Sequence, residues 1–245
     1  MAGYRLGMTN DRLYFRQLLS GRDFAQSDPF AEQMVNFVYL IGDRETKEAI
    51  IVDPAYDPSG ILDILHADDM TCVGMLGTHY HADHVGGSMM GLTVSGAAEM
   101  LGVTNVPLHI QAAEAEYVKK VTGLSDDNLI EHKGSSTLDV GSISIELLHT
   151  PGHTPGSQSF LVDNRLIAGD TLFLQGCGRT DLPGGDPEQL YHSLTKVLSQ
   201  VPDDAILFPG HQYSPQSSAT MGETRAQNMV FAPTSAEQWM SMFGQ

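Results

Sequence analysis

The run at residues 78–87, Thr-His-Tyr-His-Ala-Asp-His-Val-Gly-Gly, most limits what this chain can fold into. Imidazole and carboxylate side chains are ligands for zinc and for non-haem iron. Four such side chains within six consecutive residues exceed the needs of one tetrahedral ion, so we expect two metal ions to share the segment. Positions i, i+2, i+4 and i+5 of a helix do not share a face, which favours a tight loop, and the glycines suit one. The four ligand candidates are His79, His81, Asp83 and His84.

The same residue types recur where other apolar, strand-like runs end. The histidine cluster follows the apolar residues 70–77, so it lies where a buried strand passes into a loop. His153 follows the run 143–148, Asp170 ends the segment 165–170, and His211 ends the segment 205–211. A solvated loop or a purification tag would not repeat this setting. The sequence therefore predicts seven ligands delivered by four strand ends.

The order of apolar runs predicts one α/β domain spanning residues 1–245. Expected strands at 13–19, 35–41 and 49–52 and a helix at 59–67 precede the ligand loop. Expected strands at 143–148, 157–162, 166–168 and 206–208 follow it, with a helix that Asp186 caps and that extends to about residue 198. Two strand-rich halves suggest two sheets packed face to face with helices outside, and ligands along one edge. Between the halves, residues 88–135 are expected to form a helical excursion with a surface helix at 112–120, and residues 92–127 within it are expected to be an added lid or an oligomer contact.

Composition excludes several functions. Thirteen basic against thirty acidic residues give a net charge of -17, which would repel a nucleic-acid backbone. Residues 1–10 contain no apolar core of signal-peptide length, and no stretch approaches a membrane span, so we expect a cytoplasmic protein. Two cysteines, Cys72 and Cys177, cannot form a disulfide framework, and packing roles are favoured for both.

The spacing His-x-His-x-Asp-His at 79–84 resembles the signature of the metallo-β-lactamase fold superfamily, and the later ligands follow in that family's order. The resemblance covers nearly the whole chain and implies an αββα four-layer sandwich with the metal site at one edge between the sheets. In hydrolytic members, the residues matching Asp170 bridge two ions. The resemblance assigns the first ion to His79, His81 and His153, and the second to Asp83, His84 and His211.

Two further segments narrow the resemblance. Residues 150–156, Thr-Pro-Gly-His-Thr-Pro-Gly, and residues 169–179 are similar to both glyoxalase II and persulfide dioxygenases. Residues 179–186 resemble those of small hydrolases grouped with glyoxalase II, which favours hydrolysis of a thioester of a small thiol carrier. Only 34 residues follow His211, too few for the basic helical C-terminal domain of glyoxalase II, so glutathione itself is not favoured as the carrier.

The chemistry that this resemblance implies uses a metal-bridging hydroxide that attacks the thioester carbonyl. Asp83 is expected to be both a ligand and the group that orients the hydroxide. Arg179 either grips a substrate carboxylate or forms an ion pair with Asp181 or Asp186. Tyr213 either contacts the thiol carrier, as a tyrosine of glyoxalase II does, or packs at the strand end.

Two alternatives remain open. In persulfide dioxygenases a single iron(II) is held by the residues matching His79, His153 and Asp170, and all three are present. A non-catalytic, metal-stabilised binding protein is the other alternative, although a structural site would be smaller and closed. We expect two divalent ions, zinc first and iron or manganese as alternatives. A small thiol-derived substrate is the expected partner, without nucleic acid or membrane, and a homo-oligomer is left open.

Overall fold

Two six-stranded sheets form the centre of the computed structural model, which describes residues 11–89 and 91–244. The expectation that residues 1–10 hold no export signal lies outside the described residues. Both sheets mix parallel and antiparallel neighbours, and each contributes strand ends to the same edge of the molecule. The two-sheet architecture predicted from the order of apolar runs is confirmed.

The first sheet has the strand order β1-β2-β3-β4-β7-β8. Its strands are β1 (Leu13–Leu19), β2 (Phe37–Asp43), β3 (Glu48–Val52), β4 (Thr71–Leu76), β7 (Leu108–Gln111) and β8 (Leu129–His132). The strand expected at 35–41 begins two residues later because an unpredicted helix, α1 (Pro29–Met34), precedes it. Asp28 caps that helix at its start, and Val35 ends it in the left-handed conformation at φ 49°.

The second sheet has the order β14-β13-β12-β11-β10-β9. Its strands are β9 (Ser136–Val140), β10 (Ile143–His149), β11 (Gln158–Val162), β12 (Arg165–Gly169), β13 (Ile206–Pro209) and β14 (Ala219–Thr220). Four of them agree with the predicted runs within two residues. Strand β9 was missed because its residues, Ser-Thr-Leu-Asp-Val, alternate only weakly between polar and apolar side chains.

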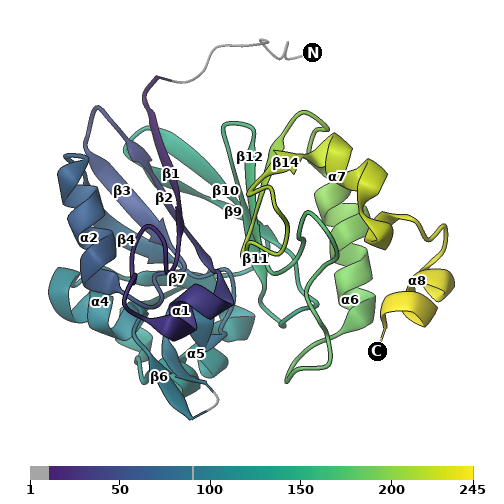
Figure 1. Cartoon of the computed structure of the whole chain (residues 1–245), viewed down its shortest axis with the longest axis horizontal. Coiled ribbons are helices and arrows are strands. Elements are labelled where there is room, and N and C mark those ends of the chain that lie inside the picture. Colours follow the sequence, from purple (N-terminus) through teal and green to yellow (C-terminus); the bar gives the residue numbers. More distant parts are fainter. Residues whose placement is uncertain (1–10, 90, 245) are drawn as a thin grey trace.

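Helices cover the outer face of each sheet (Figure 1). Helices α2 (Pro58–Ala67) and α4 (Ala97–Thr104) lie outside the first sheet, and α6 (Pro187–His192), α7 (Met221–Gln227) and α8 (Ala236–Phe243) lie outside the second. Apolar side chains fill the space between the sheets and the space beneath each helical layer. Asp186 caps α6 as predicted, and the helix continues through a π-helical turn to residue 197. The layers are therefore α, β, β and α.

The prediction of a helical excursion at residues 88–135 is wrong in part. The segment contains the hairpin of β5 (Gly87–Met89) and β6 (Leu92–Val94), then α4, and then strands β7 and β8, which extend the first sheet in parallel. Strands β7 and β8 have only four residues each, Leu-His-Ile-Gln and Leu-Ile-Glu-His, too few to distinguish from helix by periodicity. A segment that supplies two sheet strands is part of the sandwich, which excludes an added lid for these strands.

The expected surface helix at 112–120 is a 3-10 turn, Ala112–Glu114, followed by α5 (Ala115–Thr122). Glu114, Ala115 and Val118 are buried, so one face of this segment packs inward. In the described part of the chain, no helix combines the length and apolar character needed to cross a membrane.

Candidate metal centre

The histidine-rich segment is a loop followed by one helical turn. His79 and His81 lie in the loop after β4, whereas Asp83 and His84 lie on α3 (Ala82–Val85). The expectation of a loop throughout is therefore wrong for the second half. Only two of the four ligand candidates share the turn, so the ligands do not need a common helix face. Gly86, at φ 84°, ends α3 at a point where a Cβ atom would collide with the backbone of Gly96.

The other three ligand candidates come from the second sheet, as predicted. His153 lies in the loop after β10, Asp170 directly follows β12, and His211 follows β13. The isolated bridge between Asn36 and His211 joins this edge to the start of β2 in the first sheet. All seven predicted side chains converge there, five of them buried and the other two, His81 and Asp170, partly buried.

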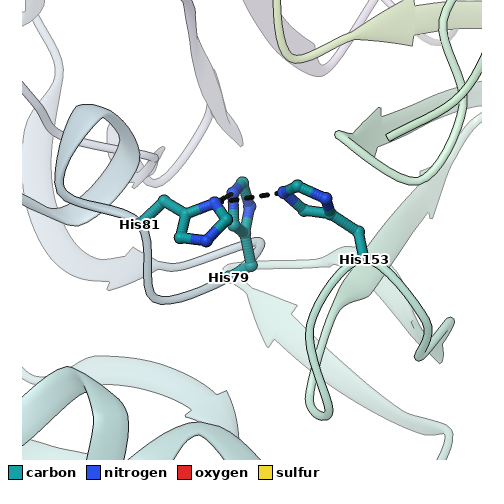
Figure 2. A group of neighbouring side chains, drawn as sticks. All are labelled: His79, His81 and His153. Atoms are coloured by element: carbon teal, nitrogen blue, oxygen red, sulfur yellow. Dashed lines mark hydrogen bonds between the residues drawn. The ribbon is translucent and has the colours of Figure 1, made fainter. Parts of the chain in front are cut away.

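The first group consists of three histidines whose rings point toward one another (Figure 2). His81 Nδ1 lies 3.0 Å from His79 Nε2 and 3.1 Å from His153 Nε2. Zinc–nitrogen bonds of 2.0–2.1 Å in a tetrahedron place ligand nitrogens about 3.3 Å apart. The spacing of the three nitrogens therefore fits a single divalent ion.

The second group consists of Asp83, His84 and His211, whose donor atoms lie within 4.8 Å of one another. His84 Nε2 and His211 Nε2 are 3.2 Å apart, and His211 Nε2 lies 3.4 Å from Asp83 Oδ2. These separations again suit ligands of one ion, so two neighbouring triads that share no residue fit two metal ions.

Asp170 lies between the groups. One carboxylate oxygen is 3.8 Å from His153 Nε2 and 3.4 Å from His211 Nε2, and the other is 3.5 Å from His84 Nε2. Its Oδ1 atom is buried and has no hydrogen-bond partner among the described residues. An orphaned carboxylate oxygen at this depth is costly unless a cation binds it, and this oxygen lies 3.5 Å from His84 Nε2, a member of the second group.

Four of the histidines form hydrogen bonds through Nδ1 on the outer side of the ring, so that Nε2 points toward the candidate metal centre. The Nδ1 atoms of these rings face outer acceptors, which favours the tautomer that presents a lone pair to a metal. The acceptors are Thr78 Oγ1 for His79 at 3.0 Å, Asp53 Oδ2 for His84 at 2.8 Å, the Arg179 carbonyl for His153 at 2.6 Å and the Met34 carbonyl for His211 at 2.8 Å. The donor set therefore matches a pre-organised metal site.

The electrostatics of the two groups differ. Burial lowers the pKa of His79 well below its ordinary value and that of His81 to about 4, so both rings are in the neutral, metal-binding form at pH 7. Burial acts in the same direction on His84, but the carboxylates of Asp83, Asp170 and Asp53 outweigh it and raise the pKa to about 10. A place where three carboxylates stabilise a proton also stabilises a metal cation.

Several supporting residues were not predicted. Asn36 donates from Nδ2 to Asp83 Oδ2 at 3.2 Å and accepts from the Tyr56 hydroxyl at 2.9 Å. Asp53 accepts hydrogen bonds from Thr78 as well as from His84. The only signal in the sequence was that Asp53 ends an apolar run, as the ligand-bearing segments do.

The predicted substrate contacts have different surroundings. Arg179 forms a bidentate ion pair with Asp181, at 2.5 and 2.6 Å, and not with Asp186. The ring of Tyr213 stacks on His211 at 4.7 Å and 7°, and 55% of the residue is exposed. Cys177 is partly buried against the apolar cluster beneath α6, which agrees with a packing role.

Three other histidines, His109, His132 and His149, lie outside the centre. His149 donates from Nε2 to the Pro155 carbonyl of its own loop at 3.1 Å. His109 and His132 stack on each other on β7 and β8 with Nδ1 and Nε2 3.0 Å apart. None of the three belongs to a group of metal-capable side chains within the described residues.

Comparison with known proteins places this geometry in context. A family model described as the Metallo-beta-lactamase superfamily matches residues 32–211. The chain is 28% identical over 216 residues to a probable polyketide biosynthesis zinc-dependent hydrolase, BaeB, of Bacillus velezensis, which covers 88% of this chain and 90% of the relative. It is 28% identical over 228 residues to the human mitochondrial persulfide dioxygenase ETHE1, and the alignment covers 92% of this chain and 82% of the relative.

A hydroxyacylglutathione hydrolase of Shewanella is 32% identical over 179 residues, which cover 73% of this chain and 62% of the relative. Among solved structures, ETHE1 from Myxococcus xanthus superposes with a TM-score of 0.77 at 28% identity, covering 95% of this chain and 90% of that one. The relatives therefore include both hydrolases and dioxygenases, at similar degrees of similarity.

Proposed function

Because the chain belongs to the metallo-beta-lactamase superfamily, we propose that it is a metal-dependent hydrolase that cleaves thioesters of a small thiol carrier. The observation that carries this proposal is the pairing of two metal-sized groups of ligands around one shared carboxylate, that of Asp170. A mononuclear site would need only part of this set. Complete ligands for a second ion support chemistry that uses two.

The proposed division of ligands follows the geometry. His79, His81 and His153 would hold one ion, Asp83, His84 and His211 the other, and Asp170 would contact both. Two divalent ions, which we propose to be zinc, supply when bound an activated water and a Lewis acid for the carbonyl. We assign Asp83 the additional role of orienting the nucleophile, because the bond from Asn36 fixes one of its oxygens.

The surroundings favour a carrier without carboxylates. A cavity of about 210 Å³ is lined by Leu174 and Ser214, the chain neighbours of Phe173 and Tyr213, whose rings both lie against His211. Its lining is amide- and hydroxyl-rich, and among the described residues that line it Glu223 is the one with a charged side chain. Arg179, the candidate carboxylate clamp, is engaged by Asp181. We therefore propose that Tyr213 contacts an uncharged carrier arm, and that Arg179 orders its own loop unless substrate displaces Asp181.

The net charge of the chain bears on which partners the proposed enzyme can have. An excess of seventeen acidic charges supports a small-molecule substrate and opposes a nucleic-acid partner. We propose that the enzyme works in the cytoplasm.

Persulfide dioxygenation is the second candidate. The similarity to ETHE1 proteins in sequence and structure favours it. His79, His153 and Asp170 also form a two-histidine, one-carboxylate set of the kind that binds iron(II). In this reaction the second group of ligands would not be needed.

One set of measurements separates the candidates. For the hydrolase we expect about two ions per chain by elemental analysis and turnover of an acyl-thiol ester that is lost in His84→Ala and His211→Ala. His66→Ala, an exposed histidine on α2, is the matched control. About one iron per chain, with oxygen uptake on a low-molecular-weight persulfide that survives in His84→Ala, would replace hydrolysis with dioxygenation. If the protein turns over neither the thioester nor the persulfide, the remaining interpretation is a metal-stabilised binding protein.

A further inference from the structure

Glu114 is a buried carboxylate with no part in the metal-ligand groups. It ends the 3-10 turn before α5 and is 1% exposed, although the sequence pattern had predicted a surface helix here. A carboxylate at this depth is costly unless charged or polar groups compensate it. The polar groups that compensate the Glu114 carboxylate belong to the two loops that carry His79, His81 and His153.

Each oxygen of Glu114 faces a different loop. Oε2 accepts from the backbone N–H of Tyr80 at 3.0 Å, and Tyr80 lies between the ligand candidates His79 and His81. Oε1 accepts from the backbone N–H of Gly156 at 2.7 Å and from the hydroxyl of Thr154, the residue after His153. One side chain therefore ties the loop after β4 to the loop after β10.

The contact is close enough to dictate a residue type. A Cβ atom added to Gly156 would press against Cγ of Glu114 and lie 2.8 Å from its backbone nitrogen. The glycine in the segment 154–156, Thr-Pro-Gly, therefore leaves room for the carboxylate to reach both loops. Burial raises the pKa of Glu114 to about 7, while the hydrogen bonds from Thr154, Gly156 and Tyr80 act in the opposite direction.

The second group of ligands is held by other means. His84 is anchored by Asp53, and His211 by the carbonyl of Met34. Figure 2 shows that the first group is assembled from two separate chain segments, with His79 and His81 on one and His153 on the other. The distance between these segments decides whether the three nitrogens meet.

We propose that Glu114 is a positioning residue for the first metal site, whose carboxylate sets the separation of the two loops that supply His79, His81 and His153. This inference rests on the metal-binding part of the proposed function and is independent of the substrate. Outer-shell groups of this kind change metal affinity by about 10–100-fold when they are replaced.

The test is the metal affinity of Glu114→Gln. Glutamine keeps the volume, but its amide nitrogen is a donor and would face a backbone N–H in one of the two loops, so one tie is lost. Purified metal-free protein is titrated with zinc against a chelating indicator, and with cobalt(II) to read the visible bands of each site. We expect about 10–100-fold weaker binding of one ion, with the three-histidine cobalt spectrum altered and the other ion bound as in the unchanged protein.

Two further variants make the result specific. Glu116→Gln removes an exposed carboxylate from α5, where Lys119 is its partner, and should bind both ions normally. Thr154→Val removes one donor to Glu114 without changing the carboxylate, and should weaken the same ion by a smaller factor.

The proposal would be overturned if Glu114→Gln bound both ions with the wild-type affinities. It would also be overturned if the variant only lowered the melting temperature of the metal-free protein and left metal binding intact. If Glu114→Gln does not fold, Thr154→Val decides by the same criterion. Failure of thioester hydrolysis with altered zinc binding would sink the proposed substrate and leave this inference standing.

Discussion

The carboxylate of Asp53 lies 2.8 Å from Nδ1 of His84, and both side chains are buried. Asp53 also accepts from the backbone N–H and the hydroxyl of Thr78, each at 2.7 Å. Since Thr78 in turn faces His79, one carboxylate at the end of β3 organises a histidine of each metal group.

Replacing Asp53 with asparagine should weaken the binding of the second metal ion most, because Asp53 bonds His84 directly but reaches His79 only through Thr78. Asparagine tolerates the φ of 57° found at this position, so the backbone need not change. Its amide nitrogen, however, must face either His84 or Thr78, both of which donate. We expect about 10–100-fold lower zinc affinity at the site of Asp83, His84 and His211, measured by chelator competition.

Asp69→Asn is the matched control, because Asp69 has a φ of 59° but its side chain is 80% exposed. That variant should bind zinc normally. Unchanged affinity in Asp53→Asn would show that His84 does not depend on this hydrogen bond for its orientation.

The charge of the thiol carrier should govern turnover. Glutathione brings two carboxylates to a site where Arg179 is paired with Asp181, and where Arg225 on the adjacent helix is engaged by Asp203. We expect kcat/KM for an acyl-pantetheine to exceed that for the same acyl group on glutathione by about tenfold, a difference of about 1.4 kcal/mol. Added salt should narrow the gap, because it screens exposed charges.

Glu223→Gln tests the source of this preference. Glutamine can still complete the capping box with Thr220 while removing the cavity's charge. In this variant kcat/KM should rise for the glutathione ester and stay unchanged for the acyl-pantetheine. A wild-type preference for glutathione would refute the uncharged-carrier assignment but not hydrolysis itself.

The convergence of the seven metal-capable side chains was predictable because each lies where an apolar run ends, and strand ends of a layered α/β fold meet at one edge. His79, His153 and His211 illustrate this: their chain segments are distant in sequence, but each follows a recognisable strand. The two-sheet architecture followed from the same runs.

The supporting groups could not be predicted, since their roles depend on contacts between segments. Asn36 and Glu114 sit in unremarkable local sequence, and only packing brings them to Asp83 and to the two loops. Strand β7 was misassigned for a related reason: four residues carry too little periodicity, and pairing with β4 decides their conformation.

Acid should destabilise the protein through His109. Burial, and then the nearby His132, lower the pKa of His109 to about 4, below its ordinary value of 6.5. Between these values the unfolded chain binds the proton and the folded chain does not, so the free energy of unfolding falls as pH drops from 6.5 to 4. The loss amounts to about 3 kcal/mol at most, at about 1.4 kcal/mol per unit.

Urea unfolding of metal-free protein at several pH values measures this dependence. His109→Asn should flatten the curve between pH 4 and 6.5, whereas His66→Asn, on the exposed side of α2, should follow the wild type. Parallel curves for His109→Asn and wild type would mean that other groups carry the acid sensitivity.

The C-terminal helix α8 should contribute to global stability. Trp239 is 1% exposed, donates from Nε1 to the Val230 carbonyl at 3.0 Å, and lies against the rings of Tyr191 and Phe243. Trp239→Ala should cost about 3–5 kcal/mol, because truncating a buried aromatic leaves a cavity and an unpaired carbonyl. Circular dichroism during urea unfolding measures it, since Trp239 is the only tryptophan.

Met242→Ala, on the same helix but 47% exposed, should change the free energy of unfolding by no more than about 0.5 kcal/mol. In the unchanged protein the fluorescence of Trp239 should be that of a buried indole and should shift to the red in one transition with the loss of circular dichroism. A red shift at lower urea would mean that α8 leaves the second sheet before the sandwich unfolds. In that case Trp239→Ala would alter the early step alone, and the stability of the metal centre would not depend on the C-terminal segment.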